Sequence, residues 1–244
     1  MTHTHSRLIW LDLLRAMAIL AMVVFHFTFD LMYFGYIKAG TVFQPEWRMF
    51  EGSIAISFLF LAGLSWQHIH RAGIKWLTVW RRVALLGVAA AGISIVTYFT
   101  FGPYMIRFGI LHLILVMSLL SLPLLSLHWA VPLACAAALG SYFIWADGPV
   151  QGSVWWMWII WTSGTTGSVD YRPIMPWGYA FFAGMAAHAL FTRLNVFAYH
   201  GPAWGWARPF AFAGRHSLAI YLIHQPLLFA GFNIYGFFFR LSIK

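Results

Sequence analysis

The chain has 244 residues, of which 61% are hydrophobic and 9% are charged, against roughly 25% charged in a typical soluble domain. Its mean hydropathy is +0.76, and one soluble core of this size could not bury so much apolar surface. The composition excludes a soluble enzyme, a disordered chain and a disulfide-stapled secreted module, and it leaves a polytopic helical membrane protein. The net charge of +9 is spread over short loops, so it reflects membrane topology and not nucleic-acid binding.

Seven stretches of the chain are candidates for membrane-spanning helices, which need about 20 apolar residues each. An eighth stretch, residues 154–161, is too short to cross a bilayer at helical rise, so we predict a re-entrant or interfacial helix there. The predicted fold class is all-α, a polytopic membrane helical bundle of about seven to eight transmembrane helices, in a single domain covering residues 1–244. The seven predicted spans are residues 8–33, 54–67, 83–101, 108–122, 128–145, 176–191 and 218–238.

Basic residues in the loops predict the orientation of the spans. The segment between the second and third spans contains Arg71, Lys75, Arg81 and Arg82, and arginines also precede the last span. Short loops rich in Lys and Arg stay in the cytosol, so both segments are predicted to be cytosolic. With seven spans, the N-terminus is then cytosolic as well.

The first predicted span carries four ionisable residues, which are costly inside a membrane and are functional candidates by default. At ~100° per residue, Asp12, Arg15, His26 and Asp30 lie within roughly 60° of the helix circumference. They form one polar stripe that must face the protein interior, with Arg15 in the inner half of the membrane and His26 in the outer half. A purely structural stripe stays open, with Asp12 paired to Arg15 and His26 to Asp30.

Two further strings carry candidate residues near the outer side. FGILH ends at His112, about one turn inside its span and at a depth similar to that of His26. DYRPIMPW begins with Asp170, Tyr171 and Arg172 and leads into a helix start that proline would stiffen. For His112 a packing role, and for the DYR residues a role as an interfacial cap, remain open.

The last predicted span opens with the string GRHSLAIYLIHQP. Arg215 would lie at its cytosolic mouth. His224 and Gln225 would lie about two turns deeper, at the depth of Arg15. Pro226 should kink the helix at this point.

Five strings occur in order along the chain: LDLLRAMAILAMVVFHFTFDL, SFLFLAGLS, FGILH, DYRPIMPW and GRHSLAIYLIHQP. Together they resemble the bacterial branch of the heparan-alpha-glucosaminide N-acetyltransferase catalytic-domain family over nearly the whole chain. More distantly, the chain is similar to the acyltransferase-3 membrane family. That family carries in its first span an arginine, ten residues and then a histidine, a pattern matched here by Arg15 and His26.

The resemblance implies transfer of an acetyl or other acyl group from cytosolic acyl-CoA, such as acetyl-CoA, to an acceptor across the membrane. In the lysosomal relatives the acceptor is a terminal glucosamine, so an amino sugar or glycan is expected here. The resemblance also places the chain in the cytoplasmic (inner) membrane of a bacterium. No nucleic acid and no metal are expected, and assembly with further copies of the chain is left open.

Acyl transfer needs a base for the acceptor, donors for the developing oxyanion and cations for the CoA phosphates. We expect His26 to be the general base or a transient acyl carrier, with Asp30 orienting its ring and with Arg15 and His112 completing the catalytic set. The residues expected to contact acyl-CoA are Arg15, Arg81, Arg82, Arg215, His224 and Gln225. Those expected to contact the acceptor are Asp12, Asp170, Tyr171 and Arg172.

Three other functions are compatible with parts of this pattern. A proton-coupled membrane transporter would also use an intramembrane stripe of Asp, Arg and His, although no inverted repeat is visible. A haem or metal protein could use some of the eleven histidines, although the chain has neither a cysteine-containing haem motif nor an HExxH string. A purely structural membrane subunit is the third, and the polar stripe argues against it.

Overall fold

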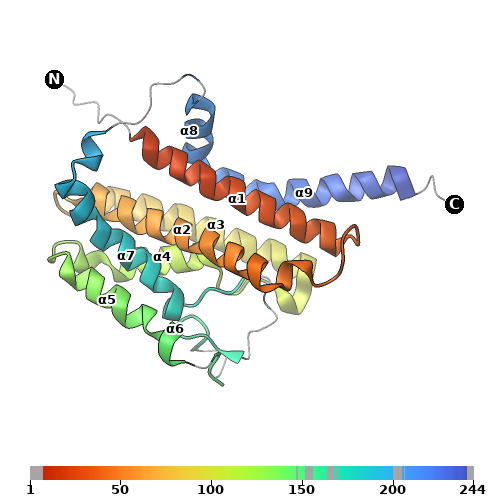
Figure 1. Ribbon diagram of the computed structural model, residues 1–244, viewed down its shortest axis with the longest axis horizontal. Coiled ribbons are helices and arrows are strands. Elements are labelled where there is room, and N and C mark those ends of the chain that lie inside the picture. Colours follow the sequence, from red (N-terminus) through yellow and green to blue (C-terminus); the bar gives the residue numbers. More distant parts are fainter. Residues whose placement is uncertain are drawn as a thin grey trace. The chain divides into compact units, whose positions relative to one another are not determined.

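The computed structural model describes residues 8–146, 148–151, 156–163, 168, 170–199, 205 and 207–240. Within these residues the protein is helical (Figure 1), and five helices are long and apolar enough to cross a membrane. The prediction of an all-α membrane helical bundle is confirmed. The five helices are α1 (Ile9–Tyr33), α2 (Pro45–His70), α3 (Trp76–Phe101), α7 (Ile174–Arg193) and α9 (Ser217–Arg240). Shorter apolar helices are α4 (Ile110–Leu120), α5 (Ala130–Gly140) and α6 (Tyr142–Trp145).

Each of the seven predicted spans coincides with one of these helices or, for residues 128–145, with α5 and α6 together. The ends follow local chemistry. Helix α2 begins at Pro45, where a missing N–H is harmless, with Glu46 at the positive end of the helix dipole. Helix α3 is followed by Gly102, whose φ of +56° ends the helix. Both helices begin earlier than predicted.

The described residues of the predicted short helix at residues 154–161, which are residues 156–161, do not form a regular α-helix. Trp156 and Ser163 have 3₁₀ conformation and residues 157–159 form a turn, while isolated bridges join Val150 with Thr162 and Ile160 with Met175. The hydroxyl of Tyr171 bonds the carbonyls of Met157 and Ile160 at 2.7 and 3.0 Å. The backbone N–H groups of Ile159 and Ile160 both donate to the carbonyl of Trp156, at 3.0 and 3.1 Å, so local pairing and the Tyr171 hydroxyl together satisfy this segment's backbone.

One helix was not predicted: α8 (Ala207–Arg215), which precedes the last span. A Cβ atom built on Gly214 would overlap the carbonyl oxygen of Asp12. Only glycine therefore allows α8 to lie this close to the start of α1.

The chain divides into two compact units, which we describe separately. Unit 1 comprises Met1–Ala55 and Phe197–Lys244, and unit 2 comprises Ile56–Val196. In unit 2, α5 packs along α7, and α3 packs on α4 (Figure 1). Gly63 of α2 meets the backbone of Phe181, and Gly184 of α7 meets the backbone of Phe60, so small residues bring α2 and α7 together.

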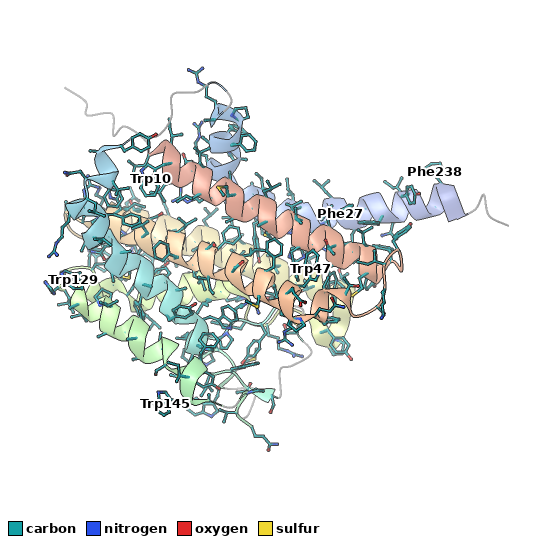
Figure 2. All side chains as sticks on the ribbon, viewed as in Figure 1. Trp10, Phe27, Trp47, Trp129, Trp145 and Phe238 are labelled. Carbon is teal, nitrogen blue, oxygen red and sulfur yellow. The ribbon has the colours of Figure 1, made fainter. Side chains whose placement is uncertain are left out.

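In unit 1, α1 and α9 run side by side in the same direction (Figure 1). The rings of Phe27 in α1 and of Phe34, directly after α1, lie 5.5 and 5.2 Å from the ring of Phe232 in α9, centroid to centroid; Figure 2 labels Phe27. His26 contacts His224, so residues later in α1 contact residues later in α9, and the two helices are parallel. Parallel first and last spans require an odd number of crossings between them, and the five intervening predicted spans satisfy this requirement.

Candidate functional site

The polar stripe of α1 meets polar side chains of α9 inside unit 1. We call the four residues His26, Asp30, His224 and Gln225 the polar seam. Asp30 and His224 are 0% and 8% exposed, although both are polar. Placing such groups between two apolar helices is costly unless they are hydrogen-bonded or have a function.

Asp30 is held by the last span and not by its neighbour on α1. Gln225 Nε2 donates a hydrogen bond to Asp30 Oδ1 at 2.8 Å. The pairing of Asp30 with His26 that helical spacing allowed is therefore not the one formed. Among the described residues, the buried atoms Asp30 Oδ2 and Gln225 Oε1 accept no hydrogen bond.

The second half of the polar seam is a pair of imidazoles. The ring of His224 lies 4.9 Å from that of His26, centroid to centroid, at an angle of 61°. His224 Nδ1 is 2.8 Å from the carbonyl oxygen of Tyr221. Because a carbonyl only accepts, Nδ1 must donate, and the neutral ring carries its lone pair on Nε2.

The depth predicted for His224 is wrong. The ring contact between His224 and His26 places His224 at the level of His26 and not at that of Arg15. The prediction assumed that the first and last spans start at the same level, whereas the contact of His224, seven residues into α9, with His26 places the start of α9 further along α1. His224 and Gln225 therefore belong with His26 and Asp30.

Arg15 forms an ion pair within its own helix, near the start of α1. Its Nη1 lies 3.0 Å from Asp12 Oδ1, with side-chain exposures of 28% and 5%. The pairing of Asp12 with Arg15 considered from the sequence is thus present. Arg215, at the end of α8, is exposed and donates from Nε to the carbonyl of Ala211 at 3.3 Å.

Two candidates in unit 2 cap the N-terminus of α4. Asp170 Oδ2 accepts from the backbone N–H of Ile110 at 3.0 Å. The backbone N–H of Gly109 donates to His112 Nδ1 at 3.3 Å, and His112 Nε2 lies 3.3 Å from Ser94 Oγ. Both ring nitrogens of His112 therefore have partners. These contacts satisfy polar groups at the start of α4.

The neighbouring residues Tyr171 and Arg172 hold the segment that enters α7. The Tyr171 hydroxyl also accepts from the backbone N–H of Thr162 at 3.2 Å, which completes its hydrogen bonding to the backbone. Arg172 lies 3.8 Å from Asp170 Oδ1, and its guanidinium carbon lies 4.6 Å from the centre of the Trp177 ring. Both residues therefore have structural contacts within unit 2.

Arg81 and Arg82 lie on α3, since this helix begins at Trp76. Arg81 is exposed. Arg82 donates from Nε to Ser118 Oγ at 3.1 Å, and its guanidinium carbon lies 4.9 Å from the centre of the Trp66 ring.

Sequence reasoning missed two features of the sites. The Tyr221 carbonyl fixes the ring of His224, and no sequence signal marks a backbone acceptor of this kind. In unit 2, His68 Nδ1 lies 3.3 Å from His188 Nε2, a contact between helices that the pattern of either helix alone does not predict. Within the described part of the chain, no group of three or more His, Cys, Asp or Glu residues could hold a metal ion.

The comparison with protein families gives a match that covers most of the chain. The family model described as "Heparan-alpha-glucosaminide N-acetyltransferase, catalytic" matches residues 7–226. The match begins before α1 and ends directly after Gln225, so it contains the whole polar seam. No curated protein and no solved structure gives a significant match.

Proposed function

Since the chain belongs to the heparan-alpha-glucosaminide N-acetyltransferase catalytic-domain family, we propose that it transfers an acetyl group from acetyl-CoA to the amine of an amino sugar, with the polar seam as its active site. Membership supports a membrane N-acetyltransferase in general terms. The donor, the acceptor and the residues are the proposed part. Asp30 carries the proposal, because it is a wholly buried carboxylate that shares only one of its oxygens with Gln225.

The hydrogen-bonding character of the polar seam favours an amine over a hydroxyl as the acceptor. Asp30 Oδ2, Gln225 Oε1 and His224 Nε2 are buried acceptors without a donor among the described residues. A protonated amine offers three N–H donors and a positive charge, whereas a hydroxyl offers one donor and no charge. A group with several donors beside a buried carboxylate satisfies more of these atoms.

His26 is proposed as the base of the transfer step. The amine nitrogen attacks the thioester carbonyl carbon, the C–S bond breaks, and the proton leaving the nitrogen passes to His26. His26 then returns that proton to the CoA thiolate, which leaves as the thiol. A transient acetyl group on His26 is the variant of this scheme in which the histidine is the nucleophile.

The CoA phosphates require cations, and unit 1 carries Arg15 near the start of α1 and Arg215 at the end of α8. Arg15 and Arg215 are proposed to contact the phosphates from the cytosol, which requires a cytosolic N-terminus, in keeping with the inner-membrane location expected from the sequence. Arg81 and Arg82, in unit 2, stay predictions for the same role. Asp12 holds Arg15, so we assign it a positioning role and not acceptor contact.

The test is acetyl transfer from labelled acetyl-CoA to glucosamine by the protein in proteoliposomes, with the product identified by mass spectrometry as an amide. The His26→Ala variant should lose about 10²- to 10⁴-fold in turnover, the usual contribution of a general base. His216→Ala, at an exposed histidine before α9, is the matched control and should keep full activity. Wild-type protein that moves protons or amino sugars without forming an amide would instead support the transporter.

A further inference from the structure

An amine acceptor must lose two protons during acetyl transfer, and His26 accounts for only one of them. Near neutral pH an alkyl amine is an ammonium ion, R–NH₃⁺, and its nitrogen has no lone pair with which to attack. The overall reaction is R–NH₃⁺ plus acetyl-CoA giving R–NH–acetyl, CoA thiol and H⁺. Two protons therefore leave the nitrogen, one before attack and one during acyl transfer.

The polar seam contains two imidazoles in contact, of which His224 is locked in one tautomer. Its Nδ1–H donates to Tyr221 at 2.8 Å, which directs the lone pair to Nε2. Nε2 is buried and has no donor among the described residues. The ring packs against His26 at 4.9 Å, and Gln225, the next residue, holds Asp30.

We infer that His224 removes the first proton, converting the bound ammonium into the neutral amine that His26 then serves in the transfer step. This inference rests on the proposed function. The N–H bond of the ammonium breaks, and its proton joins Nε2 of His224. That proton is released to solvent, while the proton taken by His26 goes to the CoA thiolate. No further reactant is required.

The charged and titratable groups around His224 come from the two helices that pack on α9 within unit 1. Helix α1 contributes His26 and Asp30 at this level, and α8 contributes Arg208 and Arg215 nearer the start of α9. Asp30 is thus the nearby group of opposite charge to an ammonium. It would hold the ion beside Nε2 until the proton leaves.

The first measurement uses wild-type protein and glucosamine. If the enzyme removes the first proton itself, kcat/KM stays nearly flat as the pH falls below the titration range of the amine. An enzyme that takes only free amine from solution loses about tenfold in kcat/KM for each pH unit in that region. Such a loss in the wild type would overturn the inference without any variant.

The second measurement uses His224→Asn, whose side-chain amide keeps an N–H donor for the Tyr221 carbonyl but has no basic nitrogen. We expect about a 10²-fold lower kcat/KM than in the wild type with glucosamine near pH 6.5. This difference from the wild type should shrink by about tenfold per pH unit as the pH rises and free amine accumulates. With methoxyamine, whose amine is already neutral at this pH, the variant should approach the wild-type rate.

A matched control separates proton transfer from helix packing. His216 Nδ1 lies 2.9 Å from the carbonyl oxygen of Phe212, four residues earlier, so it also contacts a local backbone carbonyl, but this ring is exposed. His216→Asn should leave the pH profile unchanged. A loss in His224→Asn that is equal at every pH would reduce His224 to a packing residue, whereas a wild type that forms no amide would remove the proposed function itself.

Discussion

Gln225 on α9 and Asp30 on α1 are joined by a 2.8 Å hydrogen bond between residues 195 positions apart in the chain. This bond links the last long helix to the first and fixes the carboxylate in the polar seam. The two residues were assigned to different tasks from the sequence, Gln225 to acyl-CoA and Asp30 to His26. Their contact places both in one site, with His26 and His224 beside them.

A double-mutant cycle measures this contact. Gln225→Met removes the donor and leaves the buried carboxylate of Asp30 without a partner. The same substitution should destabilise the protein less in the Asp30→Asn background, where no buried charge is left. We expect a coupling free energy of about 0.5–2 kcal/mol, the range for hydrogen bonds between membrane helices. The unfolding equilibrium in mixed micelles gives the four values needed. Additive effects would show that the bond contributes nothing.

The sequence predicted the helices well because lipid leaves few alternatives for an apolar chain. The first span ends at Tyr33, and α7 has its first regular turn after Met175, whose φ of −100° and ψ of 118° are not helical. Helix α8 was missed because its nine residues, ARPFAFAGR, are too few and too polar to cross a membrane. Its amphipathic pattern is the signal that could have revealed it.

The candidate site was predicted only in part. The phase of α1 placed His26 and Asp30 on one face, because helical phase depends on a single element. Partners on another helix depend on how far the two helices are shifted along each other, which the sequence does not give, so His224 was placed at the wrong depth. His112 and Asp170 show a second reason why the site was predicted only in part. The residue type alone does not distinguish a residue that caps a helix from one that binds substrate.

Gly214 is predicted to be highly sensitive to an added methyl group. In Gly214→Ala the new Cβ would overlap the Asp12 carbonyl, so α8 must move away from α1. We expect a loss of about 1–3 kcal/mol, or a melting temperature lower by about 2–4 °C for each kcal/mol. Gly231→Ala, on α9 with nothing within 4 Å of its built Cβ, is the control and should be neutral or slightly stabilising. Equal effects would contradict the close contact.

Asp170 is predicted to act on stability and not on turnover. Asp170→Ala leaves the N–H of Ile110 without its acceptor and removes a negative charge from the start of α4, at a cost of about 0.5–2 kcal/mol. Asp170→Asn keeps an acceptor oxygen and should cost less. Melting temperature and acetyl transfer per folded molecule separate the two effects. If turnover falls while the melting temperature stays the same, Asp170 contacts the acceptor as first expected.

The parallel arrangement of α1 and α9 predicts that the two ends of the chain lie on opposite sides of the membrane. Contacts rise together along both helices, from His26 with His224 to Phe34 with Phe232, so both enter the bilayer from the same side. With the proposed cytosolic N-terminus, alkaline phosphatase fused after Lys244 should be active and a fluorescent protein fused there dark. A fusion after Arg193, where α7 ends, should give the reverse. A fluorescent fusion after Lys244, together with a cytosolic N-terminus, would require an even number of crossings, which parallel first and last spans do not permit.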